Sequence, residues 1–136
     1  MNSAIFIAAA VFVVIAAVIH LFIFFMESVQ WSRPATWKRF GLKSQEDADT
    51  VKPMAFNQGF YNLFLAIGAA IGLILFASAQ WTQGGLVLSL FACGSMLAAA
   101  AVLIISSPKL ARAALIQGAA PLVAVVLLSV GLLTAG

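Results

Sequence analysis

A small set of polar and ionisable side chains lies within or directly beside long apolar stretches of this sequence. If these stretches cross a membrane, each such side chain must find a partner or a water-lined cavity, which makes it a candidate for ligand binding or proton transfer. The candidates are His20, Glu27, Asn57, Gln58, Tyr61, Asn62 and Gln117.

His20 and Glu27 are the ionisable members of this set. Their spacing is nearly two helical turns, so both face the same way, with His20 about 10 Å along the helix from Glu27. One hypothesis makes them the acid and base of an isomerase-like enzyme acting on a lipid-like substrate inside the membrane. At that separation they cannot both reach one bond without help from another helix. Alternatively, Glu27 pairs with a cationic group or a proton, or reaches the interface beside Arg33 or Lys52.

The amide side chains stand at the beginning of two later apolar stretches. Gln58 and Asn62 are four residues apart and share a helix face, as do Asn57 and Tyr61. Gln117 begins the last stretch. These groups could orient a ligand, or they could be hydrogen bonds between helices, each worth about 0.6 to 2 kcal/mol. The spacing leaves both interpretations open.

The elements that must position these groups are membrane spans. Hydrophobic residues make up 64% of the 136-residue chain and charged residues 8%, whereas soluble domains have about 45–50% and about 25%. Residues 53–108 contain no Asp, Glu, Lys or Arg. Continuous apolar runs of about 20 residues predict membrane-spanning helices rather than a barrel. We expect one domain, residues 1–136, folded as an all-α four-helix membrane bundle with spans at about 3–26, 54–79, 86–106 and 113–133.

All the basic residues fall in the two segments that follow the first and third spans. With four spans these segments lie on one side of the membrane, and the positive-inside rule places that side in the cytoplasm. We therefore expect a long cytoplasmic loop, residues 27–53, and both termini outside. The polar candidates then lie in the cytoplasmic half, with His20 near mid-depth, which predicts a polar pocket open toward the cytoplasm. The basic residues are Arg33, Lys38, Arg39, Lys43, Lys52, Lys109 and Arg112.

The long first loop carries a segment in which aromatic and basic residues alternate. Rings at the membrane interface with cations directed toward anionic lipid would give this pattern, and so would an ordinary aromatic belt. The residues of this interfacial segment are Trp31, Trp37, Phe40, Arg33, Lys38 and Arg39.

Helix boundaries are indicated at several positions. Ser44 followed by Glu46 and Asp47 is typical of a helix start, with Ser44 as the N-cap. Pro53 is tolerable in the first turn of the second span but would kink a longer helix. The polar, Gly-rich residues 80–85 predict a tight turn between the second and third spans.

The same sequence excludes several classes of site. The single cysteine, Cys93, rules out an internal disulfide framework, and His20 with Glu27 supplies too few ligands for a metal site. There is no nucleophile motif and no phosphate-binding loop. We expect no metal and no cofactor, and the missing motifs weigh against an enzyme without deciding the question. The net charge of +3 is explained by membrane topology, so no nucleic-acid partner is expected.

Three stretches together resemble the "domain of unknown function 1304" family of small bacterial membrane proteins. They are residues 20–23 with Glu27 and Trp31, residues 57–66 followed by Gly68, and Gln117-Gly118 with Pro121; residues 40–42 also look like the family. The Asn-Gln-Gly-x-Tyr-Asn run at 57–62 is the most specific of them. The resemblance implies four helices in a bacterial inner membrane and treats the polar candidates as one group, but it supplies no activity. One departure is Ile19, where the family often has an acidic residue, so a model with an acid pair deep in the first span does not apply.

We expect an inner-membrane protein that binds or transports a small, partly polar or lipid-like ligand in a cytoplasm-facing pocket. The alternatives are an accessory subunit of a larger membrane complex and the isomerase-like enzyme. Membrane lipid is an expected partner. A small-molecule ligand, a second copy of the chain and another membrane protein stay open, and the sequence does not name the ligand.

Overall fold

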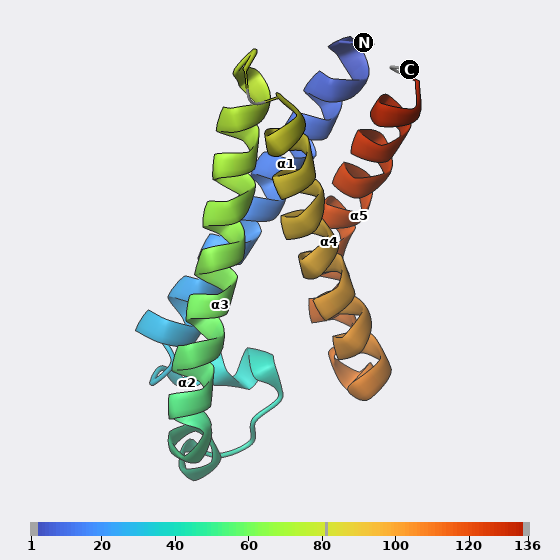
Figure 1. Cartoon of the computed structure of the whole chain (residues 1–136). Coiled ribbons are helices and arrows are strands. Elements are labelled where there is room, and N and C mark those ends of the chain that lie inside the picture. The colour runs from blue at the N-terminus through green and yellow to red at the C-terminus, as the bar shows by residue number, and fades with distance from the viewer. Residues whose placement is uncertain (1–2, 81, 135–136) are drawn as a thin grey trace.

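The computed structural model describes residues 3–80 and 82–134, and this part of the chain contains helices and turns but no strand. The long helices are α1 (Ser3–Phe24), α3 (Gln45–Ala77), α4 (Thr82–Ser106) and α5 (Ala111–Leu133). Shorter helical segments join them: the π-helical η1 (Phe25–Val29), α2 (Pro34–Trp37), and the 3-10 turns η2 (Lys38–Phe40) and η3 (Pro108–Leu110). Figure 1 shows the start of α1, the end of α5 and the α3–α4 turn at one end of the bundle, and α2 at the other.

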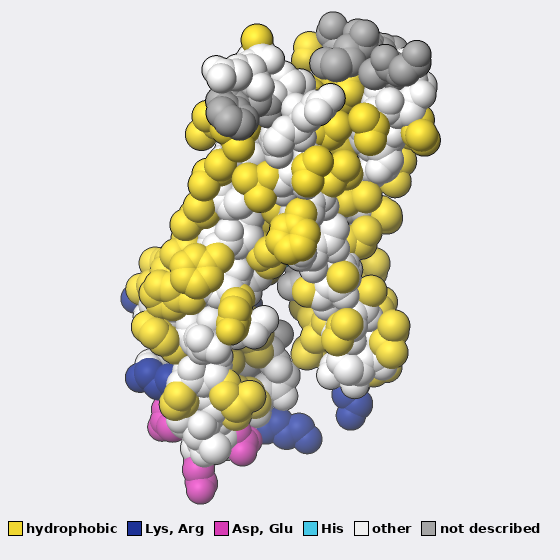
Figure 2. All heavy atoms as spheres, viewed as in Figure 1, with side chains coloured by type: hydrophobic (Ala, Val, Ile, Leu, Met, Phe, Trp, Pro, Cys, Tyr) yellow, Lys and Arg dark blue, Asp and Glu magenta, His cyan; other side chains and the backbone are white. Residues whose placement is uncertain are grey.

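Four helical stretches are long and apolar enough to cross a membrane, which confirms the all-α, four-span fold class. They are Ala4–Val29, Gln45–Ala77, Thr82–Ser106 and Pro108–Leu133. These are the spans of a multi-pass membrane protein. Large apolar side chains on their outer faces are exposed, as expected of helices that meet lipid, and they cover much of the surface in Figure 2. Examples are Ile7, Phe64, Phe91 and Ile105.

Helix α3 is longer than the second predicted span. It begins at Gln45, inside the segment expected to be loop, and its 33 residues extend about 50 Å at 1.5 Å per residue. Ser44 is the N-cap, as predicted, because its side chain accepts a hydrogen bond from the Asp47 amide at 3.0 Å. Pro53 consequently lies inside the helix rather than in its first turn. The hydrocarbon core is about 30 Å thick, so the first turns of α3 extend beyond it.

The turn between α3 and α4 is displaced from the predicted residues 80–85. Residues 82–85 form the beginning of α4, and Trp81 lies outside the described residues. Gly85, which contributed to the turn prediction, instead lies inside α4, where it allows close packing against α3. A Cβ atom on Gly85 would overlap the backbone of Phe76, and one on Gly72 would lie 2.8 Å from the Ser89 amide nitrogen. Only residues without a side chain allow α3 and α4 to approach this closely.

The helices pack in a ring in which α1 contacts α3 and α5, and α4 contacts the same two helices. The core they enclose is built largely from small and medium side chains. Its buried members include Ala9, Val13 and Ala16 of α1, Ala69 of α3, Cys93 and Met96 of α4, and Ala120, Ala124 and Leu128 of α5.

The two halves of the bundle differ in how tightly it is closed. Near the α3–α4 turn the helices lie side by side, whereas toward α2 the ribbon of α3 diverges from those of α4 and α5 (Figure 1). Figure 2 shows a hollow between them at that end, where the Lys and Arg side chains in view also lie. The polar candidates are therefore sought on the walls of this hollow.

Candidate functional site

Glu27 lies at the end of the buried stripe of the first span. Along α1 the buried positions Val13, Ala16 and His20 recur every three or four residues, and Glu27 continues this stripe in η1 with 7% of its surface exposed. A short π-helical turn at the end of an α-helix is a common feature of functional sites. The η1 turn places the Glu27 carboxylate beside the hollow, among side chains supplied mainly by α3.

Asn62 is the hydrogen-bond partner of this carboxylate. Its Nδ2 donates to Glu27 Oε2 at 3.0 Å and to the Gln58 backbone oxygen at 3.1 Å. An amide nitrogen carries two hydrogens, and both are used in these bonds. Among the described residues, no other donor and no Lys or Arg reaches the Glu27 carboxylate, so the alternative pairings with Arg33 and Lys52 are not formed.

Gly59 brings α3 against η1 so that this bond can form. A Cβ atom at Gly59 would overlap Ser28 Oγ and lie 3.1 Å from the Glu27 Cβ. Ser28 Oγ in turn donates to the Phe56 backbone oxygen at 2.9 Å. The sequence analysis did not assign a role to Gly59 or Ser28, although the glycine in the middle of the 57–62 run was a signal for close packing.

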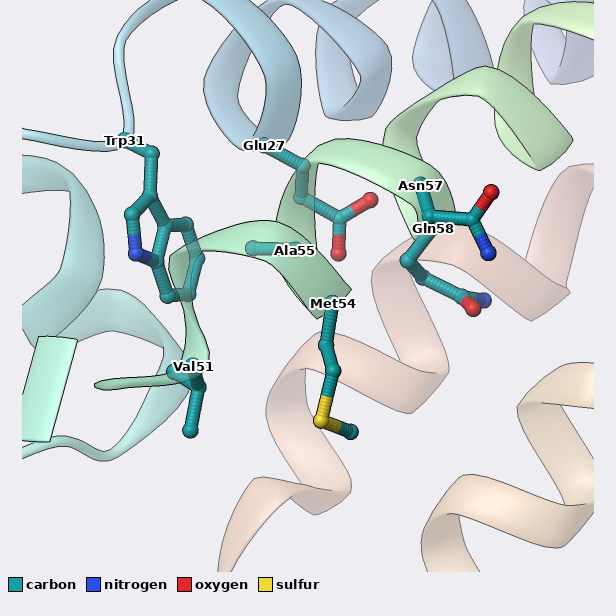
Figure 3. A pocket seen from close by; sticks show the side chains of 7 residues that line it. All are labelled: Glu27, Trp31, Val51, Met54, Ala55, Asn57 and Gln58. Atoms are coloured by element: carbon teal, nitrogen blue, oxygen red, sulfur yellow. The ribbon is translucent and has the colours of Figure 1, made fainter. Parts of the chain in front are cut away.

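A pocket of about 330 Å³ opens beside the carboxylate (Figure 3). Its lining consists of Glu27, Trp31, Val51, Met54, Ala55, Asn57 and Gln58. Most of these α3 positions fall on one helix face, which continues through Asn62 to Ala69 in the bundle core. The pocket therefore faces the space enclosed by the helices rather than the outer surface of α3.

His20 is more deeply buried than Glu27 and is not joined to it. It is 2% exposed, and its Nδ1 donates to the Ala16 backbone oxygen at 2.8 Å. A carbonyl only accepts, so the Nδ1 atom carries the hydrogen and Nε2 is the acceptor when the ring is neutral. No hydrogen bond connects His20 with Glu27 in the described part of the chain, so the structure does not assemble them into an acid–base pair.

The remaining polar candidates are only partly brought together. Gln58 and Asn57 line the pocket, whereas Tyr61 is 56% exposed and is not part of the lining. Gln117 is half-buried in α5, on the helix face that carries Ala124. Within residues 3–80 and 82–134, no hydrogen bond joins Gln117 to Glu27.

The aromatic residues of the expected interfacial segment form a second small core. Trp31 and Trp37 are 5% and 4% exposed and pack with Ala48 and Ala55 of α3, with Phe40 against them. Trp31 Nε1 donates to the Ala48 backbone oxygen at 2.8 Å. Their rings thus stabilise the connection to α3, a role that the sequence analysis did not identify. The three basic residues of the segment, Arg33, Lys38 and Arg39, are exposed.

The described residues contain no cluster of three His, Cys, Asp or Glu side chains that could hold a metal ion. What they contain is a single carboxylate, amide groups, an indole and a thioether around one pocket.

The fold and these polar groups define a small multi-pass membrane protein with a polar pocket at the end of the bundle that carries α2. The chain belongs to the family described as Protein of unknown function (DUF1304), which matches residues 14–129. This confirms the resemblance noted in the sequence, and the matched region contains every polar candidate. No curated protein and no solved structure matches the chain.

Proposed function

We propose that this protein binds a small, partly polar ligand in the pocket beside Glu27. The observation that supports the proposal is a buried carboxylate with one protein donor that borders an open space. An ionised carboxylate has about four acceptor positions, and a buried acceptor without a partner costs about 1–3 kcal/mol. A ligand that fills the pocket would satisfy the positions that Asn62 leaves free.

Comparison with a contact that is purely structural supports a binding role. The Ser28 hydroxyl donates a hydrogen bond to the Phe56 carbonyl and lies in the close contact beside Gly59. Glu27 is only one position away, yet its side chain borders a pocket instead of a close-packed contact. If Glu27 served only to tie η1 to α3, we would expect the space around it to be filled.

The proposal includes an orientation in which the ligand enters from the cytoplasmic side or the inner leaflet of a bacterial inner membrane. The basic residues all lie at the end that carries α2, and the positive-inside rule places this end in the cytoplasm and both termini outside. The opposite half is close-packed around Gly72 and Ser89. We therefore propose binding in the pocket as the function, because the described residues around Gly72 and Ser89 are closely packed.

Native mass spectrometry of the protein released gently from its own membrane tests the proposal. Wild type is compared with a Glu27→Gln, Asn62→Ala double variant. Gln83→Ala is the control, since Gln83 is exposed and lies at the other end of the bundle. We expect a discrete bound mass on wild type and on the control that is lost from the double variant. A bare wild-type protein, or attached subunits unaffected by the double variant, would contradict the proposal and favour an accessory-subunit role.

A further inference from the structure

The charge of the pocket lining is one-sided. Glu27 is the only ionisable residue in it, and the other polar lining groups are the amides Asn57 and Gln58. No Lys, Arg or His lines the pocket. An anionic ligand would bring a second negative charge to Glu27 without a cation to offset it, which is costly away from water.

Hydrogen-bonding capacity is biased in the same direction. Both Nδ2 hydrogens of Asn62 are already used, so its Oδ1 has only acceptor capacity to offer. An ionised Glu27 is also only an acceptor. At the Glu27 carboxylate the site therefore needs a ligand that donates hydrogen bonds, whereas the Asn57 and Gln58 amides of the lining can donate or accept.

The remaining walls suit an apolar body. Val51, Met54 and Ala55 supply aliphatic and thioether surface. The Trp31 ring lines the same space, and Figure 3 shows its nitrogen on the side turned away from Glu27, so the carbon part of the ring lies toward the pocket.

From these three features we infer that the ligand is an organic cation, a protonated amine on an apolar body whose ammonium group meets Glu27. This inference rests on the proposed function and names the ligand class of the same pocket. The exposed basic residues outside the lining do not oppose it, because in a bilayer they attract anionic headgroups and leave Glu27 as the charge that the ligand meets.

Three probes of similar size and different charge test the inference: 2-phenylethylamine as the cation, 2-phenylethanol as the neutral analogue and phenylacetate as the anion. Binding is measured by calorimetry with the full chain in nanodiscs of phosphatidylcholine and anionic phosphatidylglycerol, and empty nanodiscs of the same lipids correct for partition into lipid. We expect the amine to bind about tenfold or more tightly than the alcohol, which corresponds to about 1.4 kcal/mol, and phenylacetate to bind most weakly.

Charge variants at two positions make the test specific. Glu27→Gln should remove the preference for the amine, because the shape is kept and the charge is lost. Gln58→Glu and Gln58→Lys form a matched pair at an exposed lining position where folding is not at risk. The first should raise the ratio of amine to alcohol affinity and the second should lower it.

The outcomes separate this inference from the proposed function. If the alcohol or phenylacetate binds as well as the amine, and the Gln58 variants have no effect of opposite sign, the cation is excluded while the pocket stands. If none of the three probes binds, the inference is also overturned. The proposed function then depends on whether native mass spectrometry finds a bound mass that the double variant loses.

Discussion

Two parts of helix α3 make different kinds of contact. Near its carboxyl end, Gly72 lies against Ser89 and Gly85 of α4 so closely that even a Cβ atom would have no room. Near its middle, Gln58 lines the pocket together with Glu27 of η1, and Asn62 donates a hydrogen bond to the Glu27 carboxylate. Where the helix carries small residues the bundle is closed by backbone contact, and where it carries amides the bundle stays open. The close contact between α3 and α4 and the candidate site therefore lie at different positions along α3.

The largest effect is expected from closing the contact between α3 and α4. Gly85→Ala places a Cβ atom against the backbone of Phe76, which cannot move aside as a flexible side chain would. We expect a loss of about 3 kcal/mol in the free energy of unfolding, measured by thermal unfolding in detergent followed by circular dichroism.

The matched control lies in the same helix. Gly94 has no atom within 4 Å of an added Cβ, and Ala is favoured over Gly inside a helix by about 1 kcal/mol. Gly94→Ala should therefore be neutral or slightly stabilising. Equal destabilisation by both variants would show that α3 and α4 are not joined at Gly85 as described.

An intermediate effect is expected at Gly59, a close-packed glycine beside the candidate site. Gly59→Ala would push η1 away from α3 by its contact with Ser28 Oγ. We expect a loss of about 1–3 kcal/mol in the free energy of unfolding, together with loss of the mass bound in the native spectrum. Ser28→Ala in the same chain removes the oxygen and should restore part of both. No rescue in this double-mutant comparison would mean that Gly59 acts elsewhere.

A smaller effect on the free energy of unfolding should distinguish Asn62 from Asn57. Asn62→Ala leaves the buried Glu27 carboxylate without its donor and should cost about 1–2 kcal/mol in the free energy of unfolding. Asn57 is exposed, so Asn57→Ala should change it by less than about 0.5 kcal/mol. Glu27→Gln should be nearly as stable as wild type, because the Gln side-chain oxygen can still accept from Asn62. If the Asn62→Ala variant were as stable as wild type, the hydrogen bond from Asn62 to Glu27 would not contribute to the stability of the site.

Features that depend on composition and local pattern could be predicted from the sequence. The four-helix fold followed from the apolar runs, and the N-cap at Ser44 followed from the acidic residues after it. The spacing of Gln58 and Asn62 correctly placed them on one helix face, since Asn62 also bonds the Gln58 carbonyl. Each of these features depends on residues within a single helix, where the periodicity of the sequence is informative.

Features that depend on which helix lies opposite could not be predicted in the same way. The Gly-rich residues 82–85 looked like a turn because the sequence does not show that Gly85 faces Phe76. The packing of Trp31 and Trp37 on Ala48 could not be predicted, because Ala48 lies in a segment expected to be loop. In both cases a residue type typical of one role was used for packing between elements.

The smallest effect concerns the start of α3, which extends the open end beyond the membrane core. Ser44→Ala removes the side-chain acceptor for the Asp47 amide and should cost about 1 kcal/mol of helix stability. Ser44→Asp keeps an acceptor and adds a favourable charge at the helix N-terminus, so it should restore or exceed wild type. Because Trp31 packs on this part of α3 through Ala48, we expect the loss to appear as faster amide hydrogen exchange over residues 45–52, with the region around Gly72 unchanged. Exchange that rises equally at both ends would show that the two halves of α3 unfold as one unit, against the separation inferred from their packing.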